Sequence, residues 1–240
     1  MAFDLYCRIP FQETNARNPL VCEMAQVLQR SPASVARKLG NFGSFDTSLR
    51  QKGIKGLGHA GKLDREVWDE FHRDWPGLVS AAAELRAKHG FGVIEADREA
   101  LQLPDGPTER TVKAKARLHQ SFFRAAVLSS YLRECCITGL AIPEALVASH
   151  IVPWSTDERF RADPTNGLCM SATFDRLFDR GLLMVTEDLR VRFSERILRD
   201  THEITRSRIA AFEGQRIRLP QRFLPNPNRL AWHRENVFRG

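Results

Sequence analysis

The hydrophobic pattern of the chain changes near residue 146. Before that point apolar residues recur at helical spacing, as they do at i, i+3, i+4 and i+7 between residues 21 and 28. After it come short runs of β-branched and apolar residues, of which residues 146–152 are the first. A helical first half followed by short strands and a further helix predicts an α+β protein.

Two short helices are predicted in close succession. The first ends near Arg30, Ser31 can cap the second, Pro32 suits its first position and Gly40 suits its end. Helices joined by so tight a turn have the outline of a helix-turn-helix, which other small helical domains share. DNA recognition by residues 31–40 is therefore one interpretation, and ordinary packing is the other.

Positive charge is concentrated in residues 30–62, although residues 1–105 as a whole are neutral. This stretch has seven Lys and Arg residues and a single acidic residue, Asp46. Glycines lie between the cations, so the backbone can approach a phosphate group closely. The predicted contacts with DNA in this half are Arg37, Lys38, Lys52 and Lys55.

The rest of the first half is predicted to be helical. Asp64 starts a helix in which Phe71 and Trp75 share one face, and Pro76 with Gly77 ends it. A further helix runs from about residue 78 to residue 88. Aromatic residues at this spacing are typical of a helical core.

A Pro-Asp-Gly-Pro turn at residues 104–107 predicts a domain boundary. The predicted domains are residues 1–105, helical and containing the helix-turn-helix-like unit, and residues 106–240. The second begins with a long amphipathic helix. Its apolar side carries Leu118, Phe122, Ala125, Leu128 and Leu132.

The net charge of +7 arises entirely in residues 106–240, which have 22 Lys and Arg against 15 Asp and Glu. Twenty of those 22 cations are arginines, whose paired donors suit phosphate oxygens. The charge indicates either a polyanionic partner or a solvated basic surface. A C-terminal run is predicted to be a phosphate track or a loop wrapped around the domain: Arg216, Arg218, Arg222, Arg229, Arg234 and Arg239.

The chain lacks the features of membrane and secreted proteins. No apolar run approaches the roughly 18 residues of a membrane span. Asp4 stands where a signal peptide is basic, and none of the five cysteines forms a C-x-x-C pair. We expect a cytoplasmic protein with no membrane partner and with reduced thiols.

The order of elements after residue 146 points to a functional site. A strand over residues 146–152 places His150 near its end, and a polar loop leads to Asn166. A second apolar run at residues 168–170 is followed by a helix starting at residue 171 or 172, which carries Asp175 and Asp179 and ends at Gly181. A hairpin of residues 182–185 and 191–193 follows.

Four short blocks in this region occur in a fixed order. They are Cys-Cys-Ile-Thr-Gly at 135–139, Ala-Ser-His-Ile-Val-Pro at 148–153, Asn-Gly-Leu at 166–168 and Phe-Asp-Arg-Gly at 178–181. The chain thereby resembles the HNH endonucleases, in the restriction-type branch that reads C-x-I-T-G, A-x-H-I-x-P, N-G-L and F-D-x-G. The resemblance spans about residues 113–240 and implies a C-terminal ββα-metal nuclease domain.

Phosphodiester hydrolysis needs an activated water and a cation that neutralises the developing charge. His150 is the natural general base, because a neutral imidazole accepts a proton near pH 7. By resemblance, Asn166 holds the loop and orients His150. An isolated histidine at this position would be interpreted as a hydrogen-bonded core residue, and Asn166 alone as an Asn-Gly turn.

The metal ligands depart from the family pattern. Members place Asp or His before the base and histidine on the helix, whereas this chain has Ser149 and Phe174-Asp175. Asp175 and Asp179 lie on one helix face at i, i+4, and carboxylates suit Mg²⁺ or Mn²⁺. We predict Asp175, Asp179 and Ser149 as the metal site.

Arg176 and Arg180 flank these carboxylates and are predicted to bind DNA. As an alternative to metal binding, Asp179 could cap the helix or pair with either arginine.

The resemblance implies metal-dependent cleavage of double-stranded DNA by a restriction-type defence enzyme, with base modification either required or forbidden. Because one ββα site cuts one strand, a homodimer is the expected assembly. Two alternatives stay open. One is a DNA-binding protein or repressor on a decayed nuclease scaffold, and the other is a nuclease acting on RNA or single strands.

Overall fold

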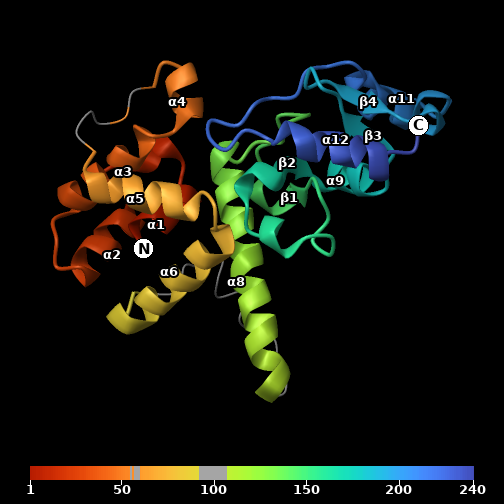
Figure 1. Cartoon of the computed structure of the whole chain (residues 1–240). Helices are drawn as coiled ribbons and strands as arrows, with labels where there is room; N and C mark the ends of the chain where they lie inside the picture. Colours follow the sequence, from red (N-terminus) through yellow and green to blue (C-terminus); the bar gives the residue numbers. More distant parts are fainter. Residues whose placement is uncertain (55, 57–59, 92–106) are drawn as a thin grey trace.

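The computed structural model describes residues 1–54, 56, 60–91 and 107–240 (Figure 1). The first part is helical: α1 (Ala2–Arg8), α2 (Pro19–Val27), α3 (Pro32–Gly43), α4 (Thr47–Gln51), α5 (Lys62–Phe71), α6 (Trp75–His89) and α8 (Pro107–Ser130). The second part is mixed: β1 (Leu146–His150), β2 (Gly167–Ser171), α9 (Ala172–Asp179), β3 (Leu183–Val185), β4 (Val191–Phe193), α10 (Glu195–Leu198), α11 (Glu203–Arg208) and α12 (Pro227–Asn236). The α+β prediction is confirmed.

The predicted pair of short helices is present as α2 and α3, which pack against each other. The Ser31 hydroxyl accepts a hydrogen bond from the backbone N–H of Ser34, as expected for a helix cap. The predicted end at Gly40 is wrong, because α3 continues to Gly43. Phe42 is buried in the core, and its burial stabilises the extra turn. Recognition of DNA by this pair stays a prediction.

The predicted helix end at Pro76 and Gly77 is also wrong. Helix α5 ends at Phe71, and Trp75 and Pro76 open α6. The Asp74 side chain caps α6 by accepting a hydrogen bond from the N–H of Gly77. Proline is well tolerated in a first helical turn, because its missing N–H has no partner there.

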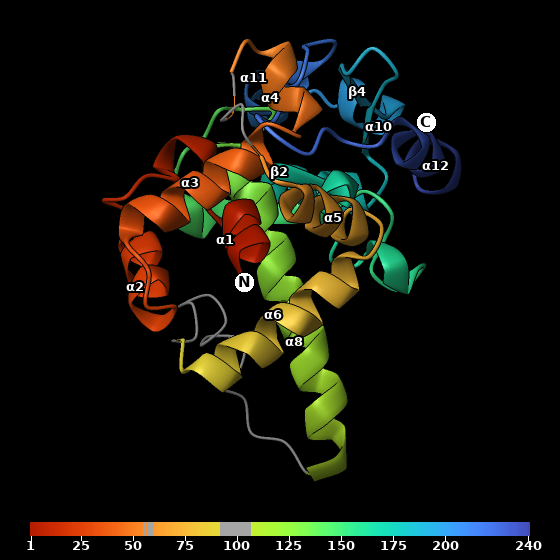
Figure 2. The ribbon, with the colours of Figure 1, turned by 60° about the vertical axis from the view of Figure 1, so that its left-hand side comes forward.

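Helix α8 runs between the helical part and the part that contains the strands (Figures 1 and 2), and it contributes to the hydrophobic core of each. Phe122 and Ala126 pack into the core of the helical part, whereas Phe123 and Val127 pack into the core beneath the strands. The helix ends at Ser130, so Leu132, at φ +56°, lies beyond it and not on its apolar side as predicted. A boundary at residues 105 and 106 falls outside the described residues.

The C-terminal arginine run does not form one exposed track. Arg222 is fully buried, and its guanidinium donates hydrogen bonds to the carbonyls of Tyr6 and Ile9 and to the Ser129 hydroxyl. Arg229 donates to the Asp163 carboxylate. The segment that contains Arg222 and Arg229 is therefore a loop wrapped around the domain, which was the second interpretation of the arginine run. Arg222 attaches this segment to α1.

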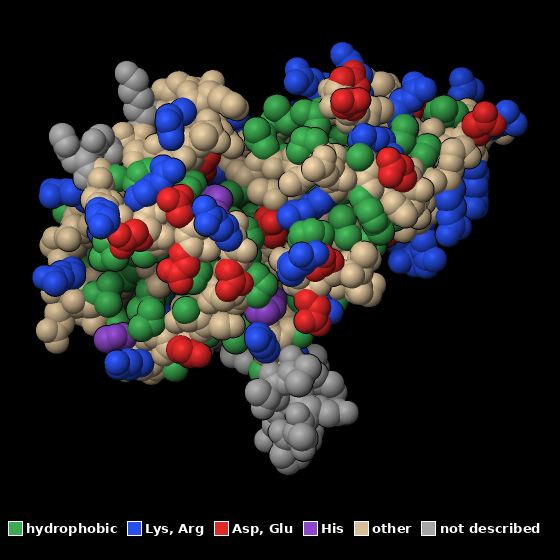
Figure 3. All heavy atoms as spheres, viewed as in Figure 1, with side chains coloured by type: hydrophobic (Ala, Val, Ile, Leu, Met, Phe, Trp, Pro, Cys, Tyr) green, Lys and Arg blue, Asp and Glu red, His purple; other side chains and the backbone are tan. Residues whose placement is uncertain are grey.

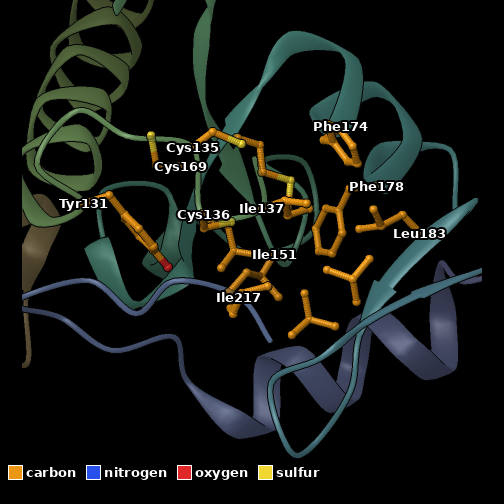
Figure 4. Packing of buried hydrophobic residues seen from close by; sticks show 14 of the residues in the cluster. Tyr131, Cys135, Cys136, Ile137, Ile151, Cys169, Phe174, Phe178, Leu183 and Ile217 are labelled. Atoms are coloured by element: carbon orange, nitrogen blue, oxygen red, sulfur yellow. The ribbon is translucent and has the colours of Figure 1, made fainter. Parts of the chain in front are cut away.

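Strands β1 and β2 pair antiparallel, with Leu146 opposite Ser171 and His150 opposite Gly167. Strand β2 leads directly into α9, which gives the predicted strand, loop, strand and helix order. Phe174 and Phe178 face a core that also contains Leu183 (Figure 4). A side chain at Gly167 would overlap Val127 of α8, so glycine allows the close packing of β2 on that helix.

None of the helices in the described ranges is both long and apolar enough to cross a lipid bilayer.

Strands β3 and β4 form the predicted hairpin.

Candidate active site

A hollow of about 480 Å³ opens between β1, the start of the following loop and α9. Six of the predicted site residues line it together: Ser149, His150, Asp175, Arg176, Asp179 and Arg180. They come from positions up to 31 residues apart, since antiparallel pairing and the direct passage from β2 into α9 bring β1 beside the helix.

His150 is held in one orientation by its neighbours. Its ring stacks on Phe123 of α8 with centroids 3.7 Å apart, and Trp154 meets it edge-on at 5.6 Å. The Nε2 atom lies 3.1 Å from the carbonyl oxygen of Arg161. Because a carbonyl can only accept, Nε2 must carry the hydrogen, and Nδ1 keeps its lone pair.

The environment of His150 keeps its imidazole in the neutral form. Burial lowers the pKa of His150 from 6.5 to about 4, and the Arg161 carbonyl only partly opposes this effect. The imidazole is therefore neutral at pH 7. Nδ1 has no hydrogen-bond partner within the described part of the chain, so it is free to accept a proton in the hollow.

The lowered pKa makes a prediction about acid stability. The unfolded chain takes up a proton on His150 near pH 6.5 and the folded chain only near pH 4, so folding loses up to about 3 kcal/mol as the pH falls through this window. We expect NMR titration of the His150 ring to give a midpoint near pH 4. Urea unfolding of His150→Gln should depend less on pH between 6.5 and 4. An NMR titration midpoint near pH 6.5 would contradict the conclusion that burial lowers the pKa of His150.

Asn166 holds the backbone that follows His150. Its side chain is fully buried, its Oδ1 accepts from the N–H of Val152 at 2.9 Å, and its Nδ2 donates to the Val152 carbonyl at 3.0 Å. The backbone carbonyl of Asn166 accepts from the N–H of Ile151. Asn166 thus positions the loop through the residues after His150, and its side chain forms its hydrogen bonds with the backbone of that loop and not with the imidazole.

Asp175 and Asp179 lie on the face of α9 that borders the hollow. Desolvation raises the pKa of both carboxyl groups, and the charge of Asp175 raises that of Asp179 further. The charges of Arg176 and Arg180 partly oppose the rise in the pKa of Asp179, but neither arginine forms an ion pair with it at 4.0 Å or less. The arginines therefore act on Asp179 at longer range than a close ion pair.

The residues of the hollow fit a small divalent cation. Two partly desolvated carboxylates repel each other, and a cation between them would relieve that repulsion. The buried Ser149 hydroxyl interacts with the Asp175 carboxylate and lowers its pKa, which partly opposes the effect of desolvation. In the described ranges, no group of three or more His, Cys, Asp and Glu side chains is arranged to hold a metal ion. Water or substrate oxygens would have to complete the coordination.

Phe174 does not reach into the hollow. Phe174 is 3 % exposed and lies on the core side of α9 (Figure 4), where its ring packs edge-on against Phe212. The helix therefore turns Asp175, the next residue, toward the site. Because the Phe174 side chain faces the core, it does not fill the space in the hollow where a cation would bind.

The predicted DNA contacts of the first half differ in their availability. Arg37 is exposed and has no partner among the described side chains. Lys38 pairs with Asp64 at 2.5 Å, and Lys52 donates to the carbonyl of Pro220 at 2.6 Å, so both amines are already engaged. Burial also lowers the pKa of Lys52. Lys55 lies outside the described residues.

Several residues that shape the site were not predicted from the sequence. The carbonyl of Arg161 fixes the tautomer of His150, and Phe123 supplies the stacking surface. Trp154 lines the hollow, and its position directly after Pro153 could have indicated it. Nothing in the sequence marks Arg161 or Phe123, since their roles depend on the loop path and on the packing of α8.

Among the curated proteins, none matches the chain. Residues 135–186 match the family model of the HNH endonucleases, and this segment contains every residue that lines the hollow.

Proposed function

We propose that the protein is a metal-dependent endonuclease that hydrolyses phosphodiester bonds in double-stranded DNA. The observation that carries the proposal is the free Nδ1 of a neutral His150 in a hollow that also presents two carboxylates and two arginines. The match of residues 135–186 to HNH endonucleases supports the same chemistry.

In this mechanism His150 accepts a proton at Nδ1 from the attacking water while Nε2 stays bonded to the Arg161 carbonyl. The charge that the imidazole then carries is desolvated, so the proton is readily released. Asp175 and Asp179, with Ser149 beside them, would hold Mg²⁺ or Mn²⁺. When bound, the cation supplies neutralisation of charge at the scissile phosphate and the leaving 3′-oxygen. Arg176 and Arg180 hold the phosphate backbone.

Incubation with supercoiled plasmid tests this function. The full chain should convert the plasmid to nicked or linear DNA in the presence of Mg²⁺ or Mn²⁺ and not in excess EDTA. Modified and unmodified plasmids, an RNA and a single-stranded DNA should be compared under the same conditions. Absence of cleavage of any duplex, with either ion, would contradict the proposal.

A restriction-type role is the finer part of the proposal. It is motivated by a helical first half that accompanies the nuclease segment and includes the helix pair α2 and α3. That half would read the sequence or its modification, and a homodimer would cut both strands. Mapped cleavage sites and the mass of the protein bound to a duplex would test these two points.

Arg37 supplies a direct test of recognition by α3. If Arg37 contacts a base edge, Arg37→Gln in the full chain should reduce discrimination between a mapped site and a scrambled duplex by about 10–100-fold. Arg65→Gln is the matched control, because Arg65 of α5 is already paired with Asp69. Competition binding measures both. An equal loss of affinity for the two duplexes would mean that Arg37 contacts only phosphate.

A non-catalytic DNA-binding protein is the second candidate. Ser149 in place of a stronger ligand, and the absence of a three-ligand cluster in the described residues, favour it. Duplex binding without cleavage by any tested ion would support this candidate.

A further inference from the structure

A second hollow, of about 450 Å³, lies beside the candidate active site. Its walls are formed by Arg180, Leu182, Ser194, Arg196, Arg239 and Gly240. Arg180 lines both hollows, so the two are neighbours on the surface. Lys and Arg side chains gather at this end of the molecule, which carries the C-terminus (Figures 1 and 3).

Among the described residues, none of the three arginines of this second hollow has a close acidic partner. Within the described residues, no acidic side chain forms an ion pair with Arg180, Arg196 or Arg239 at 4.0 Å or less, although Asp179 interacts electrostatically with Arg180 at longer range. Arg199, which directly follows helix α10, differs because it pairs with Glu195 at 2.5 Å. Three unpaired guanidinium groups around one hollow attract an anion and can grip its oxygens through paired donors.

Ser194 adds an uncharged donor at the same place. The residue is 2 % exposed, and its hydroxyl has no hydrogen-bond partner in the described structure. Ser194 precedes α10, but its side chain does not cap that helix. A buried hydroxyl without a partner is costly, and an anionic oxygen in the hollow would satisfy it.

The backbone builds the second hollow from three separate segments. The N–H of Ser194 donates to the carbonyl of Leu182 at 3.0 Å, and the N–H of Arg239 donates to the carbonyl of Gly181 at 2.8 Å. Gly181 has φ +68°, and a side chain there would collide with the carbonyl of Val237. These hydrogen bonds fix the backbone that carries the arginines before an anion binds. Binding therefore requires little further ordering of the backbone.

We propose that the second hollow is a phosphate subsite, which binds a backbone phosphate of the DNA strand beside the scissile one. The identity of the polyanion rests on the proposed function, whereas the preference for a phosphate group rests on the arginines and Ser194. Arg180 would contact both phosphates, since it borders both hollows. The subsite holds the strand in register with His150.

Two substitutions in the full chain test the subsite. Ser194→Ala and Arg196→Gln should each weaken binding of a duplex oligonucleotide about fivefold, measured by fluorescence anisotropy in EDTA. Arg196→Gln should also make the plot of log affinity against log salt shallower by about one unit. Arg199→Gln is the matched control and should stay within about twofold of the wild-type affinity, because its charge is already paired. The unfolding temperature of Ser194→Ala should be unchanged or higher, since the hydroxyl has no partner to lose.

Three results would overturn the subsite. The first is wild-type affinity in Ser194→Ala together with an equal effect of Arg196→Gln and Arg199→Gln. The second is a lower unfolding temperature of Ser194→Ala with unchanged binding, which would make the hydroxyl structural. The third is stabilisation of the wild type by inorganic phosphate, lost in Arg196→Gln, with unchanged duplex affinity; this would indicate a site for a free anion.

The same measurements separate the subsite from the proposed function. Weaker duplex binding by both variants of a protein that cleaves no nucleic acid would support the subsite and contradict the nuclease. If the protein cleaves plasmid DNA but both variants keep the wild-type duplex affinity, the nuclease function would be supported and the subsite contradicted.

Discussion

Replacing His150 by alanine or glutamine is expected to reduce cleavage of plasmid DNA by about 10²–10⁴-fold. Both substitutions remove the basic Nδ1 from the hollow. Glutamine keeps an N–H that can donate to the Arg161 carbonyl, so it preserves the hydrogen bond that orients the imidazole. The glutamine variant therefore separates loss of the base from loss of the local structure.

The expected loss is in the chemical step and not in binding. Single-turnover cleavage should fall, while duplex affinity in EDTA should stay near that of the wild type, because His150 is neutral at pH 7 and offers no charge to phosphate. His119→Gln is the matched control, since His119 is also a buried histidine but lines a different hollow. Cleavage by His150→Gln at the wild-type rate would reject His150 as the base.

Removal of the divalent ion is expected to stop cleavage, and loss of either carboxylate should raise the metal requirement. Asp175→Asn and Asp179→Asn each remove one hard anionic ligand. We expect each to raise the Mn²⁺ concentration that gives half-maximal cleavage by at least about tenfold. A titration of cleavage rate against Mn²⁺, after treatment with EDTA, measures the shift.

The same substitutions should not weaken the metal-free fold. Because the pKa of each carboxyl group is raised by the folded environment, the charged forms cost stability, and the neutral amides remove that cost. Urea unfolding in EDTA should therefore show equal or greater stability. Glu235→Gln, at an exposed position on α12, is the control for a general change of charge. Full activity of both variants at low Mn²⁺ would place the metal elsewhere.

The features predicted correctly from the sequence depend on residues close together in the chain. Ser31 caps α3 through a hydrogen bond to a residue three positions away, and Gly181 accommodates the positive φ where α9 ends. The strand, Asn-Gly, strand and helix order likewise follows from patterns of a few residues. Six candidate residues selected from these patterns line one hollow in the structure.

Other roles are decided by partners that lie far away in the sequence. Gly40 suits a helix end, but burial of Phe42 carries α3 past it. Lys38 is a plausible phosphate contact, but Asp64 occupies its amine. Of the two interpretations of the C-terminal arginine run, the wrapped loop holds at Arg222, because its buried guanidinium donates to the carbonyls of Tyr6 and Ile9.

The sequence by itself therefore determined the α+β class, the local order of elements around His150 and the family that residues 135–186 match. Only the tertiary structure decided that Phe174 faces the core, that His150 is neutral with a free Nδ1, and that Ser194 and three arginines surround a second hollow. The physical reason for this division is the distance along the chain over which each interaction acts. Helix caps and turns act over a few residues, whereas burial, tautomer and the pairing of charges depend on groups that only the folded chain brings together.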